Sequence, residues 1–224
     1  MDITIGEIIK NGVLFDMKNW EGKASSAHAL PEIIEAFFNT LEAKKISFLL
    51  VGGVALLSYF EGRNTQDIDF IISTKDLNSL SEISIENRTE TFVNGRFQGL
   101  KVDFLLTKNR LFNLIKKKYA TVRYFGGKAI PCATVEGLLI LKFYALPSLY
   151  RQGRLEKVSI YESDIEILLG KYGVELGKVF EILKKHLSES DFKEIQDIGN
   201  DIRRKIERFH SSNRRFKTEG EIIQ

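Results

Sequence analysis

The sequence predicts an α+β fold in which a half of mixed strands and helices precedes a helical half. Up to residue 131, short apolar runs alternate with turn-forming and charged segments, as is typical of strands joined by loops. Beyond Thr134, apolar residues recur three and four positions apart, which indicates helices. The chain has 224 residues, 43% of them hydrophobic, and can bury a core without disulfides or metals. We therefore expect two domains, 1–131 and 132–224.

The composition narrows the chemistry that the chain can perform. Its one cysteine, Cys132, cannot form an internal disulfide, and no targeting segment is evident at the amino terminus, so a reducing cytoplasmic setting is expected. The longest uncharged stretch, 46–60, is too short to span a membrane. With one cysteine and three histidines, a Cys/His zinc site is not expected. Any catalysis has to rely on carboxylates, lysines, hydroxyls and glycines, although the net charge of +3 reveals no such site.

The expected elements follow from periodicity and from turn residues. Pro31 can open a helix at its first position, and the helical spacing continues to about Lys45. Asn94-Gly95 predicts a hairpin turn between two strands. The expected strands cover 48–51, 67–72, 89–93, 100–106, 121–125 and 129–131, and the other expected helices cover 54–60, a basic segment after Asn109, 135–146, 163–169, 174–187 and 190–210. Residues 1–28 are assigned no regular element, although Ile3, Ile5, Ile8 and Ile9 suit a short element packed on the surface.

The stretch from Phe48 to Ser73 contains the first indication of function. A strand that ends in Gly52-Gly53 and enters a helix allows backbone N–H groups to approach a phosphate, and the helix dipole favours an anion there. By itself, a Gly-Gly pair is more often only a tight turn.

Two carboxylates in the next strand strengthen this interpretation. Asp67 and Asp69 project from the same face of a strand whose other residues are apolar. Neighbouring carboxylates repel each other, and together they suit Mg²⁺, which prefers a few carboxylates plus phosphate oxygens. Asp103 in another apolar strand would complete a three-carboxylate cluster able to hold two metals. The simpler alternatives are a solvated strand end and an edge aspartate paired with a lysine.

This combination resembles the nucleotidyltransferase superfamily of the polymerase-beta type. The motif Arg63-x-Thr65-x-Asp67-x-Asp69 most resembles that of the minimal prokaryotic members of this superfamily, including AbiEii-type toxins of toxin–antitoxin systems. The resemblance covers about residues 46–106 well and 132–170 more loosely. It implies a mixed twisted sheet with flanking helices followed by a C-terminal helical bundle. It also implies a Mg²⁺ cofactor, with Mn²⁺ as the alternative, and an NTP substrate.

The same resemblance assigns roles to individual residues. Asp67, Asp69 and Asp103 would bind metal, and Asp103 would also favour deprotonation of the acceptor. Nucleotide contacts would come from Gly52, Gly53, Arg63, Thr65 and Lys142, while Asp164 would assist at the acceptor side. Simpler interpretations stand beside these. Lys142 lies on an apolar helix face, and either reaches solvent or meets an anion. Ser163-Asp164-Ile165-Glu166 has the pattern of a capping box. Arg63 and Thr65 suit an ordinary solvated loop.

Basic residues gather in two segments that suit a polyanionic acceptor. Residues 108–128 contain seven basic residues and no acidic one, with aromatic residues interleaved, and 203–217 contain seven more against one glutamate. Such segments suit an RNA or tRNA acceptor, or else form a solvated helix face and a basic tail.

The sequence thus predicts an enzyme that moves an NMP from an NTP to a hydroxyl of RNA or protein, with an antitoxin as a further expected partner. The alternatives are a small-molecule (antibiotic-type) nucleotidyltransferase, a glycosyltransferase that uses Asp-x-Asp, and a non-catalytic nucleotide- or RNA-binding module.

Overall fold

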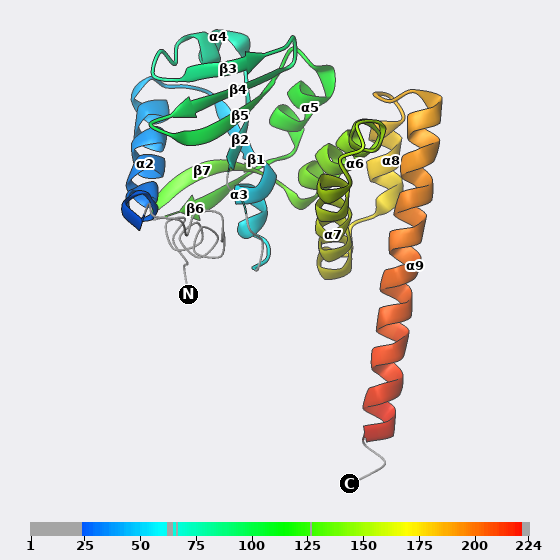
Figure 1. Cartoon of the computed structure of the whole chain (residues 1–224). Helices are drawn as coiled ribbons and strands as arrows, with labels where there is room; N and C mark the ends of the chain where they lie inside the picture. Colours follow the sequence, from blue (N-terminus) through cyan, green and yellow to red (C-terminus); the bar gives the residue numbers. More distant parts are fainter. Residues whose placement is uncertain (1–23, 62–64, 66, 126, 221–224) are drawn as a thin grey trace. The chain divides into compact units, whose positions relative to one another are not determined.

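The computed structural model describes residues 24–61, 65, 67–125 and 127–220 (Figure 1). The chain divides into two compact units, residues 1–138 and 139–224. The division falls inside helix α6 (Val135–Arg151), a few residues beyond the end of the last strand.

In the described part of the first unit, seven strands form one mixed sheet in the order β3-β4-β5-β2-β1-β7-β6. Strand β2 pairs in parallel with β5 and antiparallel with β1, which places β2 and β5 in the interior of the sheet. The strands are β1 (Phe48–Val51), β2 (Asp67–Ile72), β3 (Ser84–Arg88), β4 (Phe92–Phe97), β5 (Leu100–Leu106), β6 (Ala120–Phe125) and β7 (Lys128–Ala133). The predicted α+β class, a mixed sheet with flanking helices followed by helices, is confirmed.

Aromatic side chains pack helix α2 (Ala24–Ala43) against one face of the sheet. Phe70 on β2 is buried, and its ring lies 5.5 Å from that of Phe37 and 6.0 Å from that of Phe38, both on α2. Phe104 on β5 stacks beside Phe70 at 6.2 Å. Because side chains alternate along a strand, the even-numbered residues of β2 and β5 build this core. The odd-numbered residues, the three aspartates among them, must point to the opposite face.

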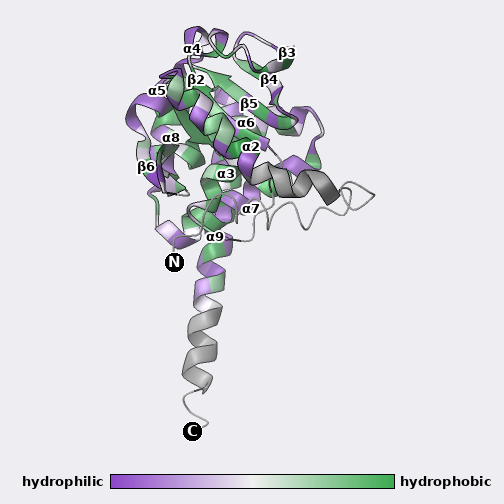
Figure 2. Cartoon of the chain, turned by 90° about the vertical axis from the view of Figure 1, so that its left-hand side faces the viewer, coloured by the Kyte–Doolittle hydropathy of each residue, from purple (hydrophilic) through white to green (hydrophobic). Residues whose placement is uncertain are grey.

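That opposite face is contacted by α3 (Gly52–Leu57) and α5 (Arg110–Lys118). Phe112 of α5 meets Phe92 of β4, and Phe92 lies opposite Leu105 on the odd-numbered face of β5. Figure 1 shows α2 and α5 on different sides of the strands. In Figure 2 the inner strands are largely hydrophobic, whereas α4 (Thr74–Asn78), at the edge of the sheet, is hydrophilic. Polar residues on β2 and β5 therefore stand out against an otherwise apolar centre.

In its described residues the second unit contains only helices. Besides the later part of α6 it includes α7 (Leu155–Tyr172), α8 (Leu176–Leu183) and α9 (Glu189–Gly220). The rings of Phe143, Phe180 and Phe192 join α6, α8 and α9, with centroid distances of 5.6 and 6.1 Å. Gly199 permits this packing, because a Cβ there would lie 2.7 Å from the Phe180 ring. None of the described helices is long and apolar enough to span a membrane.

The predicted hairpin turn at Asn94-Gly95 is wrong. Both residues lie inside β4, and the chain turns instead at Gln98 and Gly99, whose φ angles are +49° and +88°. Gly95 serves a close approach between strands: a Cβ there would lie 2.7 Å from the Ser84 carbonyl oxygen on β3. Strand β3 itself was not expected, because all five of its residues are exposed and it lacks an apolar pattern.

Two helices begin well before their predicted starts. Helix α2 begins at Ala24, so Pro31 lies within it and does not open it. Helix α7 runs without a break from Leu155, which places Ser163 in its middle and rules out the predicted capping box at Asp164. In α7 the apolar spacing already begins before Ser163, with Val158 buried three residues before Tyr161. The expectations for residues 1–23 lie outside the described residues.

Candidate active site

Three aspartates lie on one face of two neighbouring parallel strands. In the register of β2 and β5, Asp69 lies opposite Asp103, and Asp67 lies opposite Lys101. Asp67 and Asp69 are two residues apart on β2, so their side chains point the same way. The structure thus places Asp67, Asp69, Lys101 and Asp103 at four adjacent positions on the sheet. The expectation that Asp103 stands on a strand next to Asp67 and Asp69 is confirmed.

Gly52 provides the space that Asp69 occupies. Gly52 follows β1 directly, and Val51, the last residue of β1, pairs with Asp69. The φ angle of Gly52 is +67°, in the left-handed region, and a Cβ there would lie 1.9 Å from Asp69 Oδ2. No residue with a side chain fits beside Asp69 in this conformation. Glycine at position 52 therefore allows the start of α3 to lie directly against the carboxylate of Asp69.

The amino-terminal end of α3 starts at this contact. The N-cap residue is Val51, whose side chain makes no capping hydrogen bond, and Gly52 and Gly53 form the first turn. The first backbone N–H groups of a helix have no acceptor within the helix and attract anions. This arrangement suits the predicted phosphate contacts of Gly52 and Gly53.

Asp103 is held by side chains from two strands. Asn94, its partner in the register of β4, donates a hydrogen bond from Nδ2 to Asp103 Oδ1 at 2.9 Å. Lys101 Nζ lies 3.7 Å from the other oxygen, Asp103 Oδ2. Both carboxylate oxygens thus have a neighbour in the protein, and the orientation of Asp103 is fixed without a ligand. Neither Asn94 nor Lys101 was among the predicted site residues.

Asp67 is oriented in the same manner from the preceding loop. The side chain of Thr65, only 7% exposed, donates its hydroxyl proton towards Asp67, with Oγ1 lying 3.2 Å from Oδ1 and 3.3 Å from the Asp67 carbonyl oxygen. Lys101 Nζ lies 3.5 Å from Asp67 Oδ2. Thr65 is thus placed to position Asp67, and its predicted contact with a nucleotide stays a prediction. Arg63 lies outside the described residues.

The aspartates offer oxygen donors of the kind that a divalent metal ion prefers. Among the described residues, no three His, Cys, Asp or Glu side chains are assembled to hold a metal ion as they stand. The donor chemistry nevertheless fits a divalent cation, because Asp67 and Asp103 already approach one common positive charge, that of Lys101. As they stand, the Asp67 and Asp103 carboxylates face the ammonium of Lys101.

Lys142 and Asp164 form a buried ion pair in the second unit. Lys142 Nζ lies 2.6 Å from Asp164 Oδ2, and the two side chains are 6% and 5% exposed. The ammonium also stands 4.0 Å above the ring of Tyr161, one turn before Asp164 on α7. Lys142, which lies on an apolar helix face, is thus paired with an anionic side chain of the protein, that of Asp164. Its predicted contact with triphosphate, and the predicted role of Asp164 at the acceptor, stay predictions.

Several basic residues of the 108–128 segment are engaged with other protein groups. Lys108 pairs with Glu90, Lys116 donates to the Ser47 carbonyl, the Arg123 guanidinium lies over the Tyr59 ring, and Lys128 donates to Asn39. Burial lowers the pKa of Lys116. Arg110, Lys117 and Lys118 are exposed on α5. The exposed charges lie on the helix that covers the aspartate-bearing face.

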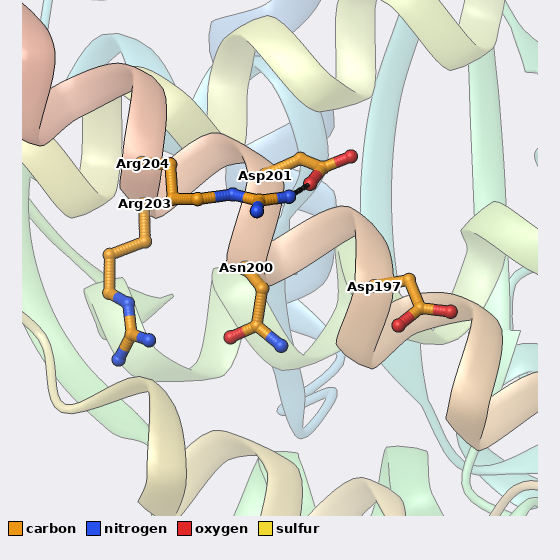
Figure 3. A pocket seen from close by; sticks show the side chains of 5 residues that line it. All are labelled: Asp197, Asn200, Asp201, Arg203 and Arg204. Atoms are coloured by element: carbon orange, nitrogen blue, oxygen red, sulfur yellow. Dashed lines mark hydrogen bonds and ion pairs between the residues drawn. The ribbon is translucent and has the colours of Figure 1, made fainter.

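Two other features do not form a second catalytic centre. Cys132 is fully buried, and burial raises its pKa to about 11, which makes its thiol a poor nucleophile near neutral pH. Figure 3 shows a surface hollow lined by Asp197, Asn200, Asp201, Arg203 and Arg204, all on α9. Asp201 and Arg204 pair with each other there. None of these residues belongs to the predicted site.

Comparison with models of protein families and with curated proteins gives no match. Solved structures resemble the chain weakly. The antibiotic-resistance factor ANT(2'')-Ia is 10% identical, with 81% of this chain and 96% of that chain covered and a TM-score of 0.46. An antigenic nucleotidyltransferase-like protein from Paracoccidioides brasiliensis is 16% identical over 75% and 91%, with a TM-score of 0.44. A tRNA-processing enzyme is 18% identical over 77% and 56%, with a TM-score of 0.31. Because these values are low, the function proposed below rests on the residues of the chain itself.

Proposed function

We propose that the protein is a nucleotidyltransferase that moves an NMP from an NTP to an acceptor hydroxyl and releases pyrophosphate. The observation that carries this proposal is the contact of Gly52 with Asp69, which lies opposite Asp103 on the parallel neighbouring strand. A helix start suited to phosphate and a set of carboxylates suited to a divalent cation meet at that point. An NTP bound with Mg²⁺ requires both.

Each group of the site has a part in this reaction. The first turn of α3 at Gly52 and Gly53 would hold the triphosphate. Asp67, Asp69 and Asp103 would hold Mg²⁺, or Mn²⁺ in its place, which when bound neutralises phosphate charge and lowers the pKa of the acceptor hydroxyl. Thr65 and Asn94 keep Asp67 and Asp103 in position through their hydrogen bonds.

The transfer itself is a displacement at phosphorus. The acceptor oxygen attacks the α-phosphorus, the bond from that phosphorus to the oxygen bridging to the β-phosphorus breaks, and pyrophosphate leaves. The hydroxyl proton passes towards the carboxylate of Asp103 and on to solvent. Positioning and charge neutralisation supply most of the rate enhancement in such reactions.

For the acceptor we propose a polyanion, in first place an RNA such as tRNA. The exposed Arg110, Lys117 and Lys118 belong to α5, which packs on the same side of the sheet as the aspartates. Three exposed cations there suit a phosphate backbone. A role as a toxin with an antitoxin partner is proposed on the sequence resemblance alone, as is an active-site role for the pair Lys142 and Asp164.

Labelled NTPs test both parts of the proposal. The protein is incubated with each NTP, labelled either at the α- or at the γ-phosphate, together with total RNA, a protein extract or an aminoglycoside. Transfer of the α-label but not the γ-label to RNA is expected, with a steep decrease as the salt concentration rises. Transfer to the aminoglycoside alone would identify the small-molecule alternative. Transfer of the γ-label would contradict nucleotidyl transfer altogether.

A further inference from the structure

Lys101 is placed among the proposed metal ligands without a part in the reaction described above. It lies two residues before Asp103 on β5 and opposite Asp67 on β2, so its side chain shares the face of all three aspartates. Its Nζ is 3.5 Å from Asp67 Oδ2 and 3.7 Å from Asp103 Oδ2. One ammonium thus bridges carboxylates of two strands.

The neighbouring basic side chain on the same face is committed elsewhere. Arg96 of β4 lies opposite Lys101, but its Nε contacts Glu86 Oε1 at 2.6 Å and its Nη1 donates to the Gly99 carbonyl at 3.1 Å. Lys101 is therefore the member of this pair that supplies positive charge to the aspartates.

The geometry of these contacts makes Lys101 easy to displace. Both distances are longer than those of a tight ion pair, and the Lys101 side chain is 39% exposed. Partly exposed ion pairs are weakened because solvent competes for both partners. A divalent cation carries twice the charge and binds several carboxylate oxygens at once, so it competes effectively for the same groups.

We propose that Lys101 is the resident counter-cation of this site: it bridges Asp67 and Asp103 when no metal is bound and is displaced when a divalent cation binds. This inference rests on the proposed function, because it takes the aspartates to be metal ligands. Lys101 keeps the carboxylates from repelling one another in the metal-free protein. Lys101 also weakens metal binding, because a metal ion can bind only when the contacts of Lys101 with the carboxylates are broken.

The test measures Mn²⁺ binding to the full chain directly, by electron paramagnetic resonance of free Mn²⁺, without reference to activity. Lys101→Met removes the charge and keeps an unbranched side chain, while Lys101→Arg retains the charge. The matched control is Lys108→Met, which removes the same charge from an ion pair with Glu90 elsewhere on the first unit. Asp69→Asn reports whether the bound Mn²⁺ uses the aspartates at all.

Lys101→Met is expected to bind Mn²⁺ roughly tenfold more tightly than the unmodified protein. Lys101→Arg and Lys108→Met are expected to bind Mn²⁺ about as tightly as the unmodified protein. The thermal midpoint provides a second readout. Without metal, Lys101→Met should unfold at a lower temperature than the unmodified protein. Saturating Mg²⁺ should raise the thermal midpoint of Lys101→Met by more than it raises that of the unmodified protein.

The possible failures are distinguishable. If Mn²⁺ binding depends on Asp69 but Lys101→Met binds no more tightly, the role of Lys101 is overturned and the proposed metal site stands. If Asp69→Asn leaves Mn²⁺ binding unchanged, the aspartates are not its ligands, and both the proposed metal site and the role of Lys101 are overturned.

Discussion

At the level of single residues, the site depends on a few close contacts of the aspartates. Gly52 is the clearest case, because two independent constraints coincide there. Its backbone is in the left-handed region, and the space that a Cβ would need is filled by the Asp69 carboxylate. Asn94 and Thr65 have the complementary role of fixing carboxylates from outside the predicted motif.

Gly52→Ala tests this crowding. The new Cβ would lie 1.9 Å from Asp69 Oδ2 and 2.7 Å from Asp69 Cβ, so the backbone of β1 or β2 has to shift. We expect a loss of about 2–5 kcal/mol in the free energy of unfolding, measured by urea denaturation, and loss of NMP transfer. Gly177→Ala in α8 is the control, since a Cβ there meets nothing within 4 Å and should leave stability equal or slightly higher. Equal stabilities of the two variants would contradict the account.

Asn94→Ala tests whether orientation of Asp103 matters. Removal of the Nδ2 donor leaves Asp103 Oδ1 without this 2.9 Å hydrogen bond and should cost about 1–2 kcal/mol of stability. The expected kinetic result is a lower kcat with little change in the KM for NTP, because the triphosphate contacts are on α3. Asn94→Asp places a second carboxylate against Asp103 and should lower kcat further. A change confined to KM would show that Asn94 does not act through Asp103.

At the scale of elements, the sequence predicts the strands that carry the site and fails at the sheet edge. Strands β1, β2 and β5 have the predicted bounds, because the apolar residues within them mark buried strands. Their juxtaposition follows from β2 and β5 pairing in parallel, which the sequence indicates only through the resemblance. Asn94-Gly95 is a sequence typical of a hairpin turn. Here, however, position 95 requires glycine because strand β3 approaches it closely. The position of Lys101 on the face of the aspartates could have been predicted from its period-two spacing to Asp103.

The ion pair of Lys142 on α6 with Asp164 on α7 allows a separate prediction. Lys142 and Asp164 are buried, so removing one partner deprives the other buried charge of an opposite charge 2.6 Å away. Lys142→Met and Asp164→Leu should each cost about 3–5 kcal/mol in the free energy of unfolding, measured by denaturant titration, whereas the double variant should cost less than either. If the pair also serves catalysis, as we propose, the double variant regains stability but not NMP transfer. Recovery of both would limit the pair to a structural role.

At the scale of the whole molecule, the apolar centre of the sheet is interrupted at one place. Odd-numbered positions of β2 and β5 carry three carboxylates and one lysine, while their even-numbered positions are buried among the aromatic residues facing α2. Concentrating like charges in the interior strands is unfavourable unless cations balance them. We therefore propose that these aspartates are present for metal and nucleotide binding, while the opposite face of the sheet supplies the stability of the unit.

Asp69→Asn tests whether the aspartates serve nucleotidyl transfer, because the substitution keeps the shape of the side chain and removes its charge. The measurement is transfer of α-label from NTP in the presence of Mg²⁺, with the thermal midpoint of each variant as the check on folding and Asp197→Asn, at an exposed position of α9, as the control. We predict that Asp69→Asn folds and loses transfer by about a hundredfold or more, while Asp197→Asn retains it. Undiminished transfer by folded Asp69→Asn would contradict the proposed site.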